Sequence, residues 1–165
     1  MQKSVILSNE EIQFKIRRIA YQIYENNSSN KEIILAGIAD NGFILAKKIK
    51  EVLDEISDLT WTLCEVNIDK QHPRNEITTS LAISDYKNKS LILVDDVLNS
   101  GTTLMYAVKH FLEVPLKQFK TAVLVNRNHK KYPIKADFKG PSLSTSLQEH
   151  ISVEFNKKET TAYLM

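Results

Sequence analysis

The chain has 165 residues, of which 42% are apolar and 25% are charged, and its formal net charge at pH 7 is +2. These values are typical of one soluble globular domain with a substantial core. No run of eighteen apolar residues occurs and the first residues are too polar for a signal peptide, so we expect a cytoplasmic protein without a membrane partner. The single cysteine, Cys64, excludes an internal disulfide framework. The small net charge neither requires nor excludes a nucleic-acid partner.

The first predicted element is an amphipathic helix that runs from Ser8 to about Tyr24. Ser8 and Glu11 have the spacing of a capping box, and isoleucines then recur at helical spacing. A cluster of helix-breaking residues at 26–30 ends this helix. The short apolar segment at residues 32–40 predicts a buried strand. The apolar pattern of residues 43–56 predicts a second helix.

The middle of the chain continues the alternation. Residues 60–68 alternate as a strand does, whereas residues 69–80 are polar, contain a proline and have no period. We interpret residues 69–80 as a loop, and loops of this length are often functional. Further elements are predicted from apolar runs and stop signals. They are a buried strand at 90–94, a helix from 100 to about 113, a strand at 120–126, and short strands at 136–139 and 150–155.

This order of elements predicts an α/β fold, with a twisted, mostly parallel sheet covered by helices on both faces and a small β-rich tail. We expect one domain, with a core over about residues 1–126 and the tail over about 127–165. In open α/β sheets, ligands bind at the carboxyl ends of the strands. Residues 37–42, residues 95–103 and the chain from Asn126 onward should therefore converge there.

The segment LILVDDVLNSGTTL, residues 91–104, carries the clearest chemistry. Residues 100–103 combine a glycine with three hydroxyl side chains before a helix N-terminus, which favours phosphate binding. Asp95 and Asp96 would repel a phosphate, but they can accept hydrogen bonds from vicinal hydroxyls or hold a divalent cation. Together the two parts fit a sugar phosphate, although each alone is also compatible with a strand end or an ordinary helix start. The sequence contains neither a P-loop nor a G-x-G-x-x-G motif, which excludes the corresponding nucleotide sites.

Residues 91–103 resemble the phosphoribosyl diphosphate (PRPP) binding motif of type I phosphoribosyltransferases. Within that family the chain is similar to the PyrR branch, the pyrimidine operon attenuators that are also uracil phosphoribosyltransferases. The resemblance extends to ILAGIADNGFILAKKI (34–49), AVLVNRNHKKYPIKADFKG (122–140) and LSTS (143–146). It implies a type I phosphoribosyltransferase-like fold with a small β-rich hood and a homodimer or higher homo-oligomer. The implied reaction transfers the phosphoribosyl group of PRPP to a nucleobase, uracil above others, and releases pyrophosphate.

The resemblance also assigns residues to the site. Asp95 and Asp96 would hold the ribose hydroxyls and are the candidate catalytic residues. The other PRPP-binding positions are Val97, Leu98, Asn99, Ser100, Gly101, Thr102 and Thr103, of which the last five form the 5-phosphate loop. The pyrophosphate loop comprises Ala39, Asp40, Asn41 and Gly42. For the base, Phe138 would pack on the ring, the backbone of Lys139 would address its edge, and Arg127 and His129 would lie at the hood entrance. The cofactor would be Mg²⁺, bound mainly by PRPP oxygens and water, with no certain protein ligand. Residues 69–80, with Lys70 and Arg74, would close over the site.

Three positions depart from the pattern of the family. Asn41 stands where PyrR proteins usually carry an arginine, Thr102 stands where they carry another, and Asn99 replaces an aspartate that acts on the base in 6-oxopurine enzymes. A hypoxanthine or guanine substrate is therefore disfavoured, because an amide cannot act as a general acid or base. Two hypotheses follow. One is an enzyme whose partners are PRPP and a nucleobase or nucleotide. The other is a regulator that binds structured RNA, or a nucleotide or PRPP sensor with little catalysis. The basic run at 127–131 fits a solvated loop, a phosphate gate or an RNA contact.

Overall fold

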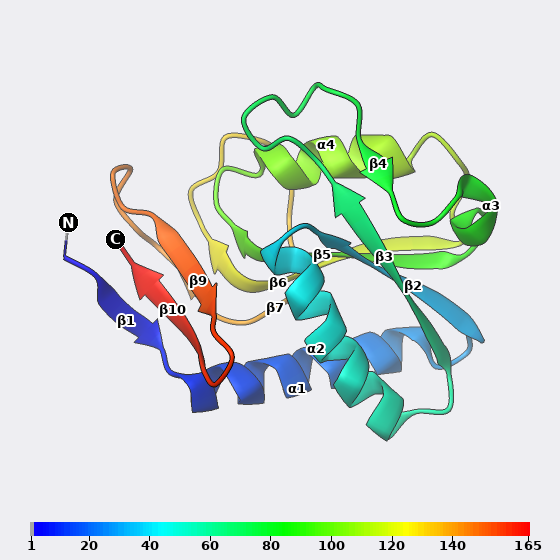
Figure 1. Ribbon diagram of the computed structural model, residues 1–165, viewed down its shortest axis with the longest axis horizontal. Helices are drawn as coiled ribbons and strands as arrows, with labels where there is room; N and C mark the ends of the chain where they lie inside the picture. The colour runs from blue at the N-terminus through cyan, green and yellow to red at the C-terminus, as the bar shows by residue number, and fades with distance from the viewer. Residues whose placement is uncertain (1) are drawn as a thin grey trace.

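In the computed structural model, which describes residues 2–165, the first helix begins at the capping box that the sequence predicts (Figure 1). Ser8 is the N-cap of α1 (Asn9–Asn27): its side chain accepts a hydrogen bond from the Glu11 amide, and the Glu11 carboxylate accepts one from the Ser8 amide. The helix ends three residues beyond the predicted end. The reason is Asn27, whose buried amide donates to the Ile23 carbonyl and whose oxygen accepts from the Ser90 hydroxyl, so the last turn is tied to the sheet.

A seven-stranded, mostly parallel sheet forms the centre of the domain, in the order β4-β3-β2-β5-β6-β7 with β8 also paired to β6. The long parallel strands are β2 (Glu32–Ile38), β3 (Thr60–Asn67), β5 (Ser90–Leu98) and β6 (Gln118–Arg127). The short strands are β4 (Thr78–Thr79), β7 (Phe138–Lys139) and β8 (Ser142–Leu143). Only β4, which pairs with β3, runs antiparallel in this sheet.

Helices cover both faces of the sheet, which confirms the predicted α/β architecture. One buried cluster joins the sheet to the inner residues of α1 and α2 (Asn41–Ile56). The cluster on the opposite face receives Tyr86 from α3 (Ile83–Tyr86) and Phe111 from α4 (Thr102–Phe111), and their rings meet edge to face. Figure 1 shows α4 on the opposite side of the sheet from α1 and α2.

A second, antiparallel sheet lies at one side of the domain, at the left in Figure 1, and we call it the small sheet. It consists of β1 (Ser4–Leu7), β10 (Thr160–Leu164) and β9 (Ile151–Phe155), in that order. The sequence predicted β9 but neither β1 nor β10, and β1 comes from the stretch that was expected to belong to the core. Leu7 and Ile151 are members of the same buried cluster as α1, so the small sheet shares the core of the domain.

Two boundaries near the carboxyl end of β5 differ from the prediction. The strand continues past Val94 to Leu98, because the backbone remains paired with β6 as far as Asn126. Asp95 and Asp96 are therefore strand residues and do not follow the strand. Helix α4 begins at Thr102 rather than at residue 100, after Gly101 in a left-handed conformation. No helix within residues 2–165 is long and apolar enough to cross a membrane.

Candidate functional site

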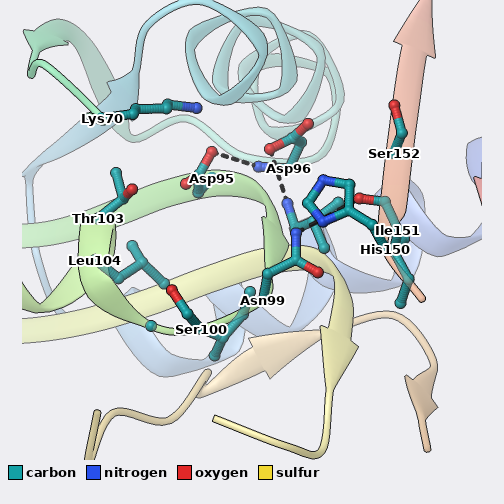
Figure 2. A pocket seen from close by; sticks show the side chains of 13 residues that line it. Lys70, Asp95, Asp96, Asn99, Ser100, Thr103, Leu104, His150, Ile151 and Ser152 are labelled. Carbon is teal, nitrogen blue, oxygen red and sulfur yellow. Dashed lines mark hydrogen bonds between the residues drawn. The ribbon is translucent and has the colours of Figure 1, made fainter. Parts of the chain in front are cut away.

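The two adjacent carboxylates lie near the carboxyl end of β5 (Figure 2). Asp95 is only 3% exposed, and its Oδ1 accepts a hydrogen bond from the Asp96 amide at 2.8 Å. Asp96 is less buried, and its Oδ1 accepts from the Val97 amide at 2.8 Å. Burial, and then the negative charge of Asp96, raise the pKa of Asp95 well above its usual range, while Lys70 opposes this shift. Asp95 and Asp96 therefore form a site of hydrogen-bond acceptors. The buried Asp95 holds its proton more tightly than a free aspartate does.

The loop between β5 and α4 has the backbone that anion binding needs. Gly101 has φ 86°, and a Cβ there would lie 2.5 Å from the Ile134 Cγ2, so both conformation and space require glycine. The hydroxyls of Ser100 and Thr102 lie 2.9 Å apart, and the Ser100 carbonyl accepts from the amides of Lys131 and Tyr132. The loop is therefore held in place just ahead of the N-terminus of α4, where backbone N–H groups and the helix dipole favour an anion.

A pocket of about 290 Å³ lies between the carboxylates, this loop and β9. It is lined by Lys70, Asp95, Asp96, Val97, Leu98, Asn99, Ser100, Gly101, Thr103, Leu104, His150, Ile151 and Ser152. All the predicted PRPP-binding residues are therefore brought together here except Thr102, which borders a neighbouring hollow. Figure 2 shows Lys70 on the side of the pocket next to Asp95, and His150, Ile151 and Ser152 across from it on the β9 side.

The predicted pyrophosphate loop borders a second hollow of about 400 Å³, lined by Ala39, Asp40, Asn41, Ile68 and Lys70. Lys70 is common to both hollows and is the one lysine or arginine among the described residues that line them. Gly42 faces neither hollow. It allows α2 to approach β5, since a Cβ at that position would lie 2.7 Å from the Val94 carbonyl oxygen.

Asn41 connects this loop to the carboxylates. Its Nδ2 donates to Asp96 Oδ2 at 3.0 Å and to the Val153 carbonyl of β9 at 2.9 Å. The position that carries an arginine in the family pattern thus holds an amide that contacts both the sugar-binding candidate and the small sheet.

The residues predicted to contact the base do not line the pocket. Phe138 is buried in the cluster beneath α1, because β7 adds to the sheet beside β6 and its side chain turns toward that helix. The Lys139 carbonyl accepts a hydrogen bond from Arg18 at 2.9 Å. Arg127 donates to the Thr145 hydroxyl and to a neighbouring carbonyl, and His129 is exposed beyond the end of β6. The four residues predicted to contact the base therefore lie outside this pocket.

The side of the pocket across from Lys70 is lined by residues that no sequence pattern indicated. Ile151 and Ser152 of β9 line it, together with His150 just before that strand; the alternation of β9 was visible in the sequence but its position beside the carboxylates was not. Asn126, at the end of β6, was expected to lie at the site only by its place in the strand order. The side-chain oxygens of Asn99 and Asn126 are buried without a hydrogen-bond partner among the described residues. Of the two, Asn99 lines the pocket, so its acceptor can serve a ligand that presents N–H groups.

The donor set suits a cation that is shared with a ligand. No group of three or more His, Cys, Asp or Glu side chains within residues 2–165 could hold a metal by itself. Asp95 and Asp96 supply two adjacent carboxylates, and Mg²⁺ commonly takes one or two carboxylates, substrate phosphates and several waters. Asp95 and Asp96 are therefore a donor set of the kind that Mg²⁺ takes from a protein.

Comparisons with known proteins agree with this geometry. Residues 2–157 match the sequence profile of the phosphoribosyl transferase domain. The chain is 34% identical over 166 residues to the Bifunctional protein PyrR of Bacillus pumilus, covering 94% of this chain and 92% of that protein. It is 33% identical over 157 residues to the Bifunctional protein PyrR of Streptococcus agalactiae, covering 93% and 91%.

Solved structures show the same fold at lower identity. The hypoxanthine phosphoribosyltransferase of Trypanosoma cruzi aligns with a TM-score of 0.78 at 14% identity, covering 96% of this chain and 95% of that one. A hypoxanthine-guanine phosphoribosyltransferase of Bacillus anthracis aligns with a TM-score of 0.72 at 20% identity, covering 86% and 82%. The chain belongs to the type I phosphoribosyltransferase family, in its PyrR branch.

Proposed function

We propose that the protein transfers the phosphoribosyl group of PRPP to a nucleobase, with uracil preferred, and releases pyrophosphate. The observation that carries this proposal is the single pocket that holds Asp95 and Asp96 on one side and residues 99–101 and Thr103 on another. Its PyrR relatives support a pyrimidine over a purine, and so does Asn99, since an amide cannot exchange a proton with a purine base.

The geometry suggests how the substrate would be oriented. The ribose hydroxyls would donate to Asp95 and Asp96, and the 5-phosphate would accept from the loop before α4, so that two ends of the sugar are fixed. The pyrophosphate would then lie toward Lys70 and the hollow at residues 39–41, and the base toward β9. Fixing the sugar in this way lowers the entropy that must be lost in the transition state, and Lys70 would stabilise the departing negative charge.

The chemical step would break the bond between C1 of the ribose and the pyrophosphate oxygen and form a bond from C1 to the base nitrogen. The base loses its N–H proton to pyrophosphate or water, so PRPP and uracil give uridine monophosphate and pyrophosphate. Mg²⁺ would neutralise part of the diphosphate charge, and Asp95 and Asp96 would hold it through water.

The test is a panel of bases (uracil, hypoxanthine, guanine, adenine) with PRPP, following pyrophosphate release with and without Mg²⁺. We expect turnover with uracil and Mg²⁺, and its loss in the Asp95→Asn and Asp96→Asn variants. If no base in the panel supports pyrophosphate release, the proposed activity is wrong.

Lys70 provides a quantitative prediction for the same reaction. Lys70→Met removes the one lysine or arginine that the described residues contribute to the two hollows, so KM for PRPP should rise roughly 10- to 100-fold, as expected for a lost charge-assisted contact. Binding of ribose 5-phosphate, which lacks the diphosphate, should change much less. Lys158→Met, an exposed lysine in the turn between β9 and β10, is the control and should leave both values unchanged. Equal effects on the two ligands would show that Lys70 does not address the diphosphate.

A second candidate function, binding of structured RNA, is favoured by the exposed face of α1. Phe14 and Tyr21 are 66% and 44% exposed, and Arg17 and Arg18 lie between them at helical spacing. The Arg17 guanidinium lies 5.7 Å from the centre of the Tyr21 ring. Aromatic rings and arginines together can stack on unpaired bases of RNA.

The RNA candidate is tested by measuring affinity for a stem-loop RNA at several salt concentrations. Affinity should fall steeply with salt, Arg17→Ala should reduce the slope by about one, and Phe14→Ala should weaken binding without changing the slope. A response that is flat in salt would remove this candidate. The oligomeric state that we propose, a homodimer or higher homo-oligomer, can be measured by sedimentation in the same buffers.

A further inference from the structure

We propose that Asn41 is a positioning residue that couples the sugar-binding carboxylate Asp96 to strand β9, and so couples sugar binding to the side of the pocket that would receive the base. This inference rests on the proposed function. Asn41 is the first residue of α2, and its single amide nitrogen carries two hydrogens. It has two acceptors within hydrogen-bond distance, Asp96 Oδ2 at 3.0 Å and the Val153 carbonyl at 2.9 Å. These two acceptors belong to different sheets.

The contact with Asn41 orients the Asp96 carboxylate without occupying all of its hydrogen-bond acceptor positions. One carboxylate oxygen of Asp96 accepts from the Val97 amide and the other accepts from Asn41, so the plane of the carboxylate is held from both sides. An ionised carboxylate has about four acceptor positions, so ligand hydroxyls can still donate to Asp96. A ligand that binds to Asp96 holds the carboxylate in place, and the carboxylate in turn restrains Asn41 through their hydrogen bond.

The other end of the contact holds β9, which packs on the core through Ile151 and Val153 but has few hydrogen bonds on that side. Within residues 2–165, β9 is the last strand of the small sheet and pairs only with β10. Its free edge faces the amides of the core: Asn41 meets the Val153 carbonyl, and Asn99 makes a longer contact of 3.5 Å with the Ile151 carbonyl. Because residues 150–152 line the pocket, the position of β9 sets the width of the pocket. Asn41 is the stronger of the two attachments.

A purely structural role for Asn41 makes the opposite prediction for one substitution. An acidic side chain in the first turn of a helix is stabilising, so Asn41→Asp should be neutral or favourable if the residue only helps to begin α2. If Asn41 couples Asp96 to β9, Asn41→Asp should be the worst variant, because a carboxylate cannot donate to either acceptor and repels Asp96. Asn41→Gln keeps the donor and should recover part of the coupling.

The experiment is hydrogen–deuterium exchange of the full chain, followed at residues 150–155, alone and with saturating ribose 5-phosphate or with PRPP and Mg²⁺. In the wild type, either ligand should slow exchange in this segment. In Asn41→Ala, exchange without ligand should be roughly tenfold faster and the ligand-induced slowing should be lost. Asn41→Asp should exchange fastest and Asn41→Gln should fall between Asn41→Ala and the wild type. Asn128→Ala, which removes an exposed amide bonded to the Ser144 hydroxyl, is the matched control and should behave as the wild type does.

The outcomes separate this inference from the proposed function. If the wild type binds PRPP but Asn41→Asp exchanges at the wild-type rate and keeps the ligand-induced slowing, the coupling is wrong and the proposed function stands. If the wild type binds neither ligand, the proposed function is wrong, and the exchange rates of the free variants still test the link between Asn41 and β9. Circular dichroism on each variant shows whether the total helix content of the wild type is kept.

Discussion

At the scale of single residues, the site holds a carboxylate at a position where burial disfavours its charged form. Asp95 is almost fully buried, and no cation lies within ion-pair distance of it among the described residues. Burial and the charge of Asp96 raise its pKa, so the folded chain binds a proton at pH values where the unfolded chain has released it. Stability therefore falls as pH rises from the usual range of an aspartate to the raised pKa of Asp95.

Asp95→Asn should consequently stabilise the fold while it abolishes PRPP binding. The amide has the same shape and no charge, so we expect a gain on the order of 1–2 kcal/mol at pH 8 that shrinks as pH falls through the usual aspartate range. Urea unfolding at pH 4, 6 and 8 measures it. Asp58→Asn, at an exposed aspartate in the turn after α2, is the control. A variant less stable than the wild type at pH 8 would show that the ionised carboxylate is favourable in the fold.

At the scale of elements, the site depends on how closely α2 approaches β5. Gly42 makes this approach possible, because its Cα stands against the Val94 carbonyl and the Asp95 backbone. The helix start then brings Asn41 within reach of Asp96. A glycine in the first turn normally lowers the stability of a helix. Its presence here is explained by the close contact between the two backbones, which leaves no room for a larger residue.

Gly42→Ala should therefore be destabilising, although alanine is the better helix former. A Cβ would lie 2.7 Å from a backbone oxygen that cannot rotate away, so we expect a loss of about 2–3 kcal/mol and weaker PRPP binding as Asn41 moves. Thermal unfolding and calorimetric titration measure the two effects. Lys47→Ala, at an exposed position on the same helix, should change stability by less than about 0.5 kcal/mol. A stable Gly42→Ala variant with unchanged affinity would contradict this account of the site.

At the scale of the whole molecule, the small sheet and the large sheet share one core. Leu7 of β1 and Ile151 of β9 belong to the buried cluster that also contains the inner face of α1 and residues of β2 and β5. The N-terminal strand β1 and the last strand β10 pair with each other, so segments from the two ends of the chain lie side by side in the small sheet (Figure 1). We therefore expect both sheets to unfold in one transition.

Leu7→Ala tests this cooperativity from a position remote from the site. Leu7 is buried, so the variant should lose about 2–4 kcal/mol, and the fluorescence of Trp61 in β3 and the circular dichroism should change together. Val5→Ala removes a side chain that is 61% exposed on the same strand and should lose less than about 0.5 kcal/mol. Loss of the small sheet before the change at Trp61 would show that the two sheets unfold separately.

Sequence by itself determined the features that are encoded over a few residues. The capping box of Ser8 and Glu11, the alternation of strands and helices, and the acidic and glycine-containing segment of β5 are local patterns of hydrogen bonding and periodicity. They were sufficient for the α/β class, the parallel sheet covered on both faces and the resemblance to phosphoribosyltransferases. They also located the carboxylates and the glycine loop that line the pocket.

Only the tertiary structure decided which distant segments complete the site. Val153 accepts from Asn41 across 112 residues, and β9 lines the pocket through Ile151 and Ser152, which no local pattern indicates. Phe138, predicted to face the base, turns into the core because β7 pairs beside β6. The physical reason is range: capping and periodicity act within a turn or a strand, whereas the partner of an edge strand is set by how two sheets share buried surface.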